Sequence, residues 1–235
     1  IKTIMGGVFA TAMPQKALEH VDAVVIGEVE GLGKEIVNDL NAGKLKQIYQ
    51  NPQPPDLTHT RAPRWDLMKN NRYYHVNFPM ETSRGCPHNC SFCFSSYQYP
   101  GFRKRSLDDI ERDLGQYDHG MLEIVDLHFA GDRDFAIEVC KLIEAANLPG
   151  WYGETTIHSL DNEKFLATLA ASRCRQMFVG LESVSPDALG HMNKSFNPVR
   201  DYKRILHMCQ DYGIYIQAGF IWGADGQGPG DFEET

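Results

Sequence analysis

The sequence predicts an α/β protein: a partial (β/α) barrel of about five parallel strands, preceded by the last part of a smaller α/β domain. Three observations predict this fold. Strand-length apolar runs alternate with amphipathic helical stretches, a proline-rich segment at 51–63 separates two such regions, and polar residues or glycines follow several expected strands. Because neighbouring parallel strands need a crossover between them, regular alternation indicates a parallel sheet covered by helices.

The first region is expected to contain two strands and two helices. Apolar runs at 1–7 and 22–26 predict the strands, and residues 14–20 and 32–40 predict the helices. The glycine-containing residues 27–31 predict a turn after the second strand.

The proline-rich segment sets the expected domain boundaries. Residues 51–63 include four prolines and show no periodicity, which indicates a linker or a wrapping segment. We therefore expect an α/β domain at 1–45, a linker at 46–75 and the barrel at 76–235. The chain starts on a strand-like run at Ile1 and ends on what resembles the start of another helix, so we expect it to be incomplete.

The second region repeats strand and helix in order. Strands are expected at 76–80, 123–129, 151–157, 176–181 and 214–221, with helices at 107–114, 134–146 and 163–171, a short helix from 186 and another from 198 to 212. Ser106 is the expected N-cap of the first of these helices, because Asp109 follows three residues later. Gly213 is expected to end the last one in a left-handed conformation.

Composition narrows the class of protein. The 235 residues are 42 % hydrophobic and 23 % charged, as in a globular protein with a real core. The net charge of −8 argues against a nucleic-acid partner, and the basic run Arg103-Lys104-Arg105 is more typical of a solvated loop. No apolar run approaches the roughly 18 residues of a membrane span. Six cysteines without a dense framework favour a reducing cytoplasm.

Three of the cysteines share one loop, in the segment Glu81-Thr-Ser-Arg-Gly-Cys86-Pro-His-Asn-Cys90-Ser-Phe-Cys93. The spacing C-x3-C-x2-C allows three thiolates to converge on one metal centre. A structural zinc site would need a fourth ligand, for which His88 is awkwardly placed between the cysteines. A [4Fe–4S] cluster with three cysteines keeps one iron open for a substrate.

This loop resembles the signature of the radical S-adenosylmethionine (SAM) superfamily, in which an aromatic residue, here Phe92, precedes the last cysteine. The resemblance implies that Cys86, Cys90 and Cys93 hold the cluster and that SAM binds the fourth iron through its amino and carboxylate groups. One-electron reduction then cleaves the sulfonium bond and gives a 5′-deoxyadenosyl radical. It also implies that the barrel is of the radical SAM type.

The same resemblance implies a set of SAM contacts at the carboxyl ends of strands, where α/β barrels build their sites. They are Phe92, Gly131, Asp132, Glu182, Ser183 and Gly223. Glu182 and Ser183 lie in Gly-Leu-Glu-Ser, which is similar to the family's G-[IL]-E-S. Each acid also has a simpler interpretation: Asp132 as a helix cap and Glu182 as a satisfied strand-end carboxylate.

Other polar residues of this region are weaker candidates. Glu154 and Lys194 follow the same placement rule, although a lone lysine is usually solvated. His128, on a strand, is more often a core histidine than a ligand. The remaining cysteines share no ligand spacing and are expected to be buried: Cys140, Cys174 and Cys209.

The first fifty residues resemble the last third of a cobalamin-binding Rossmann-like domain. The resemblance rests on Met5 to Thr11 and on Val24 to Glu30, and it implies that Gly6, Gly7, Gly27 and Glu28 lie near a corrinoid, since small residues allow close approach. Relatives usually carry histidine where this chain has Phe9. The alternative is a degenerate domain whose glycines only form turns. Residues 61–67 also resemble the lead-in of cobalamin-dependent radical SAM proteins.

Together these resemblances imply a cobalamin-dependent radical SAM methyltransferase that acts on an unactivated carbon of a small-molecule or lipid-like substrate. A flavodoxin or ferredoxin is the expected electron donor, and no protein side chain is assigned a catalytic role. Two alternatives stay open: a radical SAM enzyme that catalyses a rearrangement or an oxidation, and an iron–sulfur electron carrier without SAM turnover.

Overall fold

The structure is a computed structural model that describes residues 1–58, 60, 63–64, 78–117 and 120–233. It divides into two compact units. The first comprises Ile1–Leu57 and Phe94–Gly101, and the second comprises Thr58–Cys93 and Phe102–Thr235. The short segment Phe94–Gly101, just after the cysteines, thus belongs to the first unit. Among the described helices, none combines the length and apolar character needed to cross a bilayer.

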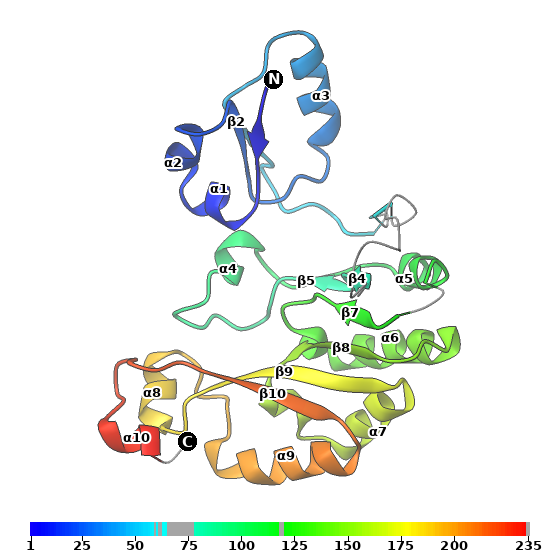
Figure 1. The fold of residues 1–235 in the computed structure, drawn as a ribbon, viewed down its shortest axis with the longest axis vertical. Helices are drawn as coiled ribbons and strands as arrows, with labels where there is room; N and C mark the ends of the chain where they lie inside the picture. Colours follow the sequence, from blue (N-terminus) through cyan, green and yellow to red (C-terminus); the bar gives the residue numbers. More distant parts are fainter. Residues whose placement is uncertain (59, 61–62, 65–77, 118–119, 234–235) are drawn as a thin grey trace. The chain divides into compact units, whose positions relative to one another are not determined.

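The first unit contains a parallel sheet in the order β1-β2-β3 (Figure 1). The strands are β1 (Ile4–Met5), β2 (Ala23–Ile26) and β3 (Ile48–Gln50), and the helices are α1 (Val8–Ala12), α2 (Pro14–Leu18), α3 (Gly33–Asn41) and α4 (Ser95–Gln98). Successive residues of β2 face opposite sides: Ala23 and Val25 pack with Ile36 and Tyr49, whereas Val24 packs with Ala10.

Three elements of this unit were not expected, namely α1, β3 and α4. Helix α1 begins directly after Gly7, whose φ of 90° turns the chain from β1 into the helix. Strand β3 lies inside the range expected as linker. Its three residues are too few to show a period, and Tyr49 becomes buried only because β2 pairs with it.

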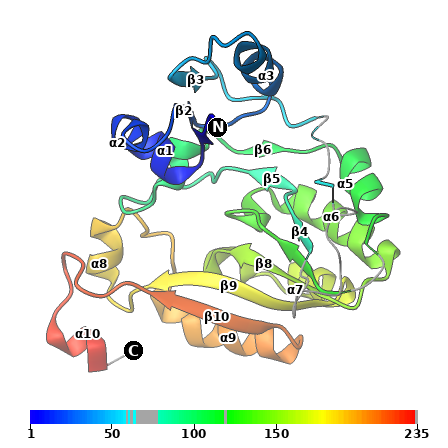
Figure 2. The ribbon, with the colours of Figure 1, turned by 45° about the horizontal axis from the view of Figure 1, so that its top comes forward.

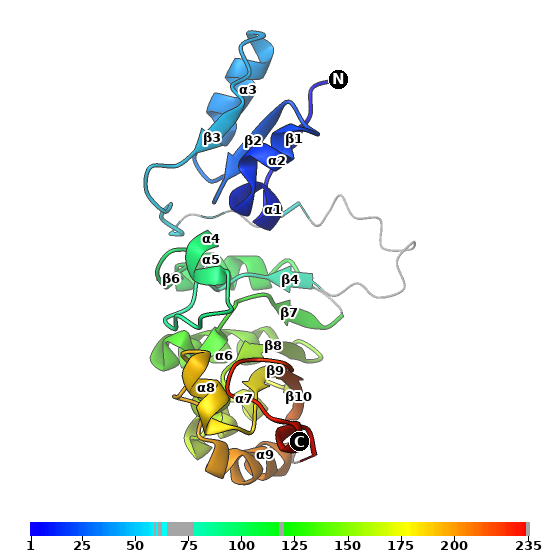
Figure 3. The ribbon, with the colours of Figure 1, turned by 90° about the vertical axis from the view of Figure 1, so that its left-hand side faces the viewer.

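The second unit is built on a five-stranded parallel sheet in the order β10-β9-β8-β7-β4, which confirms the predicted partial barrel. The strands are β4 (Phe78–Met80), β7 (Leu122–Ile124), β8 (Trp151–Thr155), β9 (Cys174–Glu182) and β10 (Tyr215–Phe220). Figure 3, which views this sheet from its edge, shows α5, α6, α7 and α9 on one side of it.

Local signals in the sequence set the starts of these helices. They are α5 (Leu107–Leu114), α6 (Arg133–Ala146), α7 (Glu163–Ala171), α8 (Pro186–His191), α9 (Tyr202–Asp211) and α10 (Pro229–Glu233). The Ser106 side chain accepts from the Asp109 amide, as predicted, and Asn162 and Ser185 cap α7 and α8 in the same way. Gly213 adopts the predicted left-handed conformation, with φ 70°.

The strand expected at 123–129 is much shorter than predicted. The chain leaves the sheet after Ile124, and Phe129–Gly131 forms a 3₁₀ turn (η3). Similarly, β8 ends at Thr155 and a second 3₁₀ turn (η4, Ile157–Leu160) follows. Apolar character alone suggested longer strands, because residues of these turns are buried as deeply as strand residues.

A small antiparallel hairpin was also unexpected. Strands β5 (Ser83–Arg84) and β6 (Arg103–Lys104) pair on either side of the cysteine loop (Figure 2). Two-residue strands are too short to show a period, so no signal in the sequence predicted this pairing.

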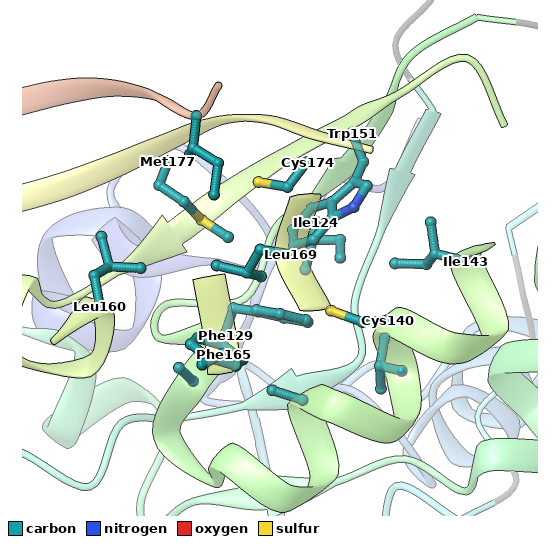
Figure 4. Packing of buried hydrophobic residues seen from close by; sticks show 14 of the residues in the cluster. Ile124, Phe129, Cys140, Ile143, Trp151, Leu160, Phe165, Leu169, Cys174 and Met177 are labelled. Carbon is teal, nitrogen blue, oxygen red and sulfur yellow. The ribbon is translucent and has the colours of Figure 1, made fainter. Parts of the chain in front are cut away.

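One hydrophobic core fills the space between the sheet and its helices. Figure 4 shows Phe129, Trp151, Phe165 and Leu169 packed together, and the rings of Phe129 and Trp151 meet edge to face at 5.0 Å. The predicted burial of three cysteines is confirmed: Cys140, Cys174 and Cys209. Burial raises the pKa of Cys140 to about 12, which keeps this thiol protonated.

Candidate functional site

The cysteine loop carries three thiols, none of them in a disulfide. Cys86 and Cys90 are partly buried and Cys93 is exposed. Within the described residues, no three His, Cys, Asp or Glu side chains come together as the ligands of a single metal ion would. A four-iron cluster uses one thiolate per iron, so its ligands need not meet at one point. Three cysteines on one loop could each supply one thiolate to such a cluster.

The loop lies against the segment that follows α8. Ser91 donates its backbone N–H to the Met192 carbonyl at 3.0 Å, and Asn193 donates its side-chain amide to the Asn89 carbonyl at 2.6 Å. The His88 ring stacks on Phe196, with centroids 3.9 Å apart. His88, the awkward zinc candidate, is thus packed against an aromatic ring and helps to seat the loop.

The thiols sit in a mixed electrostatic environment. Burial raises the pKa of the Cys86 thiol, and the two neighbouring thiols raise it further. Burial also raises the pKa of Cys90, and the Lys194 ammonium partly offsets this effect. A metal centre binds thiolates and not thiols, so the positive charge of bound iron would supply the stabilisation that these crowded sulfurs lack.

Lys194 and Glu182 form a buried ion pair beside the cysteine loop. The Lys194 Nζ lies 2.7 Å from Glu182 Oε1, and the two side chains are 8 % and 11 % exposed. Glu182 has φ 66°, a conformation that a non-glycine residue rarely adopts. Such a backbone persists only where its surroundings hold it, and it is typical of functional sites. The Lys194 ammonium also lies 5.8 Å from the centre of the Phe92 ring.

Gly180 makes room for this ion pair. A Cβ atom at Gly180 would lie 2.1 Å from Glu182 Oε1 and 2.9 Å from Lys194 Nζ. Any larger residue there would have to displace the carboxylate. The glycine of Gly-Leu-Glu-Ser is therefore explained by the packing of its own glutamate.

Asp132, the other acid expected to contact SAM, already has two partners. One oxygen accepts from the Phe135 amide at 3.0 Å and caps α6, and the other lies 2.6 Å from Lys104 Nζ. The Lys104 contact and the amide hydrogen bond lower the pKa of this carboxyl. A Cβ at the preceding Gly131 would meet the Phe102 ring at 2.6 Å, so this glycine allows close packing. This geometry is that of the helix-cap alternative.

Ser183 follows the carboxyl end of β9, and Gly223 lies in the segment after β10. Ser183 Oγ accepts from the Ser185 amide at 3.0 Å and from Gln227 Nε2 at 3.2 Å. Gln227 also donates to the Ile221 carbonyl at 2.9 Å, so it ties the ends of the two strands together. Gly223 has φ 82°, and a Cβ there would meet open space. The glycine is needed for its backbone conformation.

The first unit has a cavity of its own, about 260 Å³ in volume, beyond the carboxyl ends of β2 and β3. Gly27 and Glu28 line it, together with Thr11 and Tyr97. The Thr11 hydroxyl accepts from the Gly27 amide at 2.9 Å, which fixes the turn after β2. Gly6 and Gly7 lie at the carboxyl end of β1, as expected from the sequence.

A second cavity, about 280 Å³, lies on the sheet face of the second unit. Its lining combines Glu123, Glu154, Phe178 and Gln217. Partial desolvation, and then the neighbouring Glu123 carboxylate, raise the pKa of Glu154. This face offers both apolar contacts and hydrogen-bonding groups to a ligand.

His128 is buried, 2 % exposed, and its ring lies 5.3 Å from that of His88 on the cysteine loop. Its Nδ1 lies 3.2 Å from Thr155 Oγ1, and burial lowers its pKa to about 3, so the ring is neutral.

Sequence reasoning missed one acid altogether. Asp126 is 1 % exposed and accepts hydrogen bonds from Thr82 and Ser83, just before the cysteine loop. One signal in the sequence could have revealed it. Asp126 lies two residues after Ile124 in an apolar run, so an aspartate falls on the inward-facing side of the expected strand. Most of the lead-in resemblance at 61–67 lies outside the described residues.

Two curated relatives match nearly the whole chain. The chain is 25 % identical to bacteriochlorophyllide d C-12(1)-methyltransferase of Chlorobaculum tepidum over 99 % of its length and 53 % of that protein. It is 26 % identical to the anaerobic magnesium-protoporphyrin IX monomethyl ester cyclase of Rubrivivax gelatinosus, over 100 % of the chain and 48 % of the relative. The chain thus spans about half the length of these curated relatives.

A solved structure shows the same fold. The radical SAM methyltransferase TsrM from Kitasatospora setae, solved with cobalamin and a [4Fe–4S] cluster bound, superposes with a TM-score of 0.78 at 18 % identity, over 98 % of this chain and 53 % of that one. The family model described as "Radical SAM superfamily" matches residues 80–235. This range includes the cysteine loop and the strands of the barrel sheet, except for the first two residues of β4. The chain therefore belongs to the radical SAM superfamily.

Proposed function

We propose that this protein is a cobalamin-dependent radical SAM methyltransferase that acts on an unactivated carbon. The observation that carries the proposal is the arrangement of three cysteine thiols on one loop beside the buried Glu182–Lys194 pair. Cys86, Cys90 and Cys93 would each hold one iron and leave the fourth iron open for SAM. When reduced, such a cluster supplies the electron that splits the sulfonium bond of SAM.

The Glu182–Lys194 pair suits the amino-acid portion of SAM. That portion carries an ammonium and a carboxylate, and the pair offers the complementary charges in a partly dry environment. Phe92, Ser183 and Gly223 would complete the pocket for SAM, with Gly131 from the η3 turn that follows β7 and Asp132 from the start of α6. The protein's part is to orient SAM and to keep water away.

Cobalamin is proposed for the first unit, with residues 1–45 as the last part of its binding domain. The cavity lined by Gly27 and Glu28 lies where α/β sheets bind ligands, beyond the carboxyl ends of parallel strands. Its volume is below the roughly 300–1000 Å³ of common ligand sites, so it would take only part of the cofactor. Gly6 and Gly7, after β1, would give the corrinoid close approach. Bound cobalamin would supply the methyl group.

The sheet-face cavity is the proposed substrate site. Its apolar and hydrogen-bonding groups suit a small or lipid-like molecule with a polar substituent. The methyltransferase relative supports methyl transfer, whereas the cyclase relative favours a second candidate, an oxidative radical reaction without methylation. A flavodoxin or ferredoxin would deliver the electron, and a reducing cytoplasm suits the oxygen-sensitive cluster.

The test is anaerobic reconstitution with iron, sulfide and hydroxocobalamin, followed by dithionite and SAM. Formation of 5′-deoxyadenosine separates a radical SAM enzyme from an electron carrier, which would reduce without consuming SAM. Corrinoid absorption that stays with the protein through gel filtration would support cobalamin binding. SAM cleavage without retained corrinoid would favour the oxidative or rearranging enzyme.

A further inference from the structure

Asp126 contacts the chain just before the cysteine loop through four hydrogen bonds. The strand register explains this contact: β4 pairs with β7 so that Met80 lies opposite Ile124, and Thr82 and Asp126 each follow two residues later. Asp126 Oδ1 accepts from the Thr82 amide at 2.7 Å. Oδ2 accepts from the Thr82 hydroxyl at 2.5 Å, the Ser83 amide at 2.8 Å and the Ser83 hydroxyl at 2.6 Å.

This set of donors calls for a carboxylate. Two amides and two hydroxyls converge on two oxygens, and all three residues are almost fully buried, at 0 % for Thr82 and 1 % for Ser83 and Asp126. An asparagine would replace one acceptor by an N–H₂ group that faces donors. Hydrogen bonds to a charged acceptor are also the stronger ones, more so away from water.

The fixed backbone leads directly into the first cysteine. Thr82 also accepts from the Arg105 amide at 2.9 Å, so the segment is held on both sides. Arg84 is the last residue of β5, Gly85 turns the chain with φ 88°, and Cys86 follows. Two residues, Arg84 and Gly85, separate Ser83 from Cys86, and over so short a stretch a change of backbone direction moves the thiol.

We propose that Asp126 is a positioning residue for the cluster: its carboxylate fixes Thr82 and Ser83 and thereby sets where Cys86 presents its sulfur. This inference rests on the proposed function, because it presumes that Cys86 binds iron. Asp126 does not touch the cluster loop's thiols and acts only through the two residues that it holds. If the contact merely satisfied a buried acid, its loss would lower stability without a specific effect on the cluster.

The experiment uses a matched pair at Thr82 in the full chain. Thr82→Val keeps the shape and removes one hydroxyl donor, whereas Thr82→Ser keeps the donor and removes a methyl group. Asp126→Asn removes the charge. Ser172→Ala is the control for the loss of a buried hydrogen bond elsewhere, since Ser172 Oγ accepts from Trp151 Nε1 at 3.0 Å. The readouts are the rate at which a chelator bleaches the cluster and the electron paramagnetic resonance spectrum of the reduced cluster with and without SAM.

Asp126→Asn and Thr82→Val should bleach about tenfold faster than wild type, equivalent to about 1.4 kcal/mol of loop opening, and should show altered spectra. Thr82→Ser and Ser172→Ala should bleach at the wild-type rate with unchanged spectra. Wild-type behaviour of Asp126→Asn, or equal acceleration in Ser172→Ala, would overturn the inference.

Hydrogen exchange of the iron-free protein keeps this inference separate from the proposed function. The Thr82 and Ser83 amides should be protected in wild type and exchange faster in Asp126→Asn. Wild-type protein that takes up no iron would refute the proposed function, while the exchange measurement would still decide whether Asp126 fixes the segment. Unchanged exchange at both amides would refute the positioning role.

Discussion

Two buried carboxylates near the cysteine loop are stabilised in different ways. Glu182 is balanced by the Lys194 ammonium, so the pair adds little net charge to the site. Asp126 accepts four hydrogen bonds from neutral donors, which leave its negative charge in place when the carboxyl is ionised. The first arrangement suits exchange of partners with a charged ligand, and the second suits holding a backbone in place.

At the residue scale, the cysteine assignment makes the first prediction. The triple variant Cys86→Ala, Cys90→Ala and Cys93→Ala should lose the brown colour, the iron and SAM cleavage, because these thiols are the expected ligands. The triple variant Cys140→Ala, Cys174→Ala and Cys209→Ala is the matched control and should keep its iron, since those thiols lie in the core. Iron analysis of both proteins, anaerobically reconstituted, decides the matter. Full iron content in the loop variant would contradict the assignment.

A second prediction concerns Glu182. Glu182→Gln should weaken SAM binding by about 1.5–3 kcal/mol, roughly ten- to a hundredfold, because a charged hydrogen-bond partner is lost. Isothermal titration with SAM on cluster-loaded protein measures this change. Asp161→Asn removes a carboxylate paired with Arg204 on the surface and should leave SAM affinity unchanged. An intact cluster with wild-type SAM affinity in Glu182→Gln would rule out the role.

The third prediction is a pH dependence of stability. Burial raises the pKa of Asp126 from 3.8 to about 6, against the effect of its hydrogen bonds. Between these values the folded protein binds more protons than the unfolded chain, so this residue's contribution to the free energy of unfolding is greatest below pH 3.8 and is lost as pH rises through 6. The loss amounts to roughly 3 kcal/mol.

Urea unfolding of wild type and Asp126→Asn across this range tests the third prediction. The difference in unfolding free energy between the two proteins should change with pH in favour of Asp126→Asn as the pH rises. Parallel pH profiles for the two proteins would show that Asp126 titrates normally.

Local spacing explains which site residues the sequence could reveal. The three cysteines lie within eight positions, and a metal-ligand spacing is readable at that range. The partner of Glu182 lies twelve residues away, beyond α8, and the donors to Asp126 lie more than forty residues before it. Such pairings follow from strand register and helix packing, which a single sequence does not display.

At the scale of elements, the sequence predicted the helices that have a clear apolar periodicity or a capping residue, and it did not predict the shortest helices and strands. Helix α7 was predicted at its observed bounds, and in the structure Asn162 caps it. By contrast, α1 depends on the backbone conformation of Gly7, and the β5–β6 hairpin depends on pairing between segments on either side of the cysteine loop. Tertiary contacts decide such short elements, because two to five residues have little intrinsic preference.

The fourth prediction uses two matched helix caps. Asp132 accepts from the Phe135 amide at 3.0 Å and Asn162 from the Phe165 amide at 2.9 Å. Asp132→Ala and Asn162→Ala should each cost about 0.5–2 kcal/mol of stability, measured by thermal or urea unfolding. We expect only Asp132→Ala to weaken SAM binding as well. Equal SAM affinity in the two variants would leave Asp132 as a helix cap and a partner of Lys104.

At the scale of the whole molecule, the chain has separate hydrophobic cores. One cluster fills the second unit, around Trp151 and Leu166, and two small clusters lie in the first unit, around Ile36 and Ala17. Each unit thus has its own source of stability, and a ligand that binds one unit should stabilise that unit first.

The last prediction follows from this separation. Calorimetry of the cluster-loaded protein should resolve two transitions. Leu166→Ala leaves a cavity in the large core and should lower the midpoint temperature of one transition, because it costs about 2–5 kcal/mol of unfolding free energy. Ile36→Ala should lower the midpoint temperature of the other. Cobalamin at about a hundred times its dissociation constant adds about 2.7 kcal/mol to the state that binds it. It should therefore raise the transition that Ile36→Ala lowers, whereas SAM should raise the transition that Leu166→Ala lowers. Cobalamin that instead raised the Leu166-sensitive transition would place the corrinoid on the barrel and remove the role proposed for Gly27 and Glu28. The assignment of the cluster to Cys86, Cys90 and Cys93 would be unaffected, since it depends only on the loop.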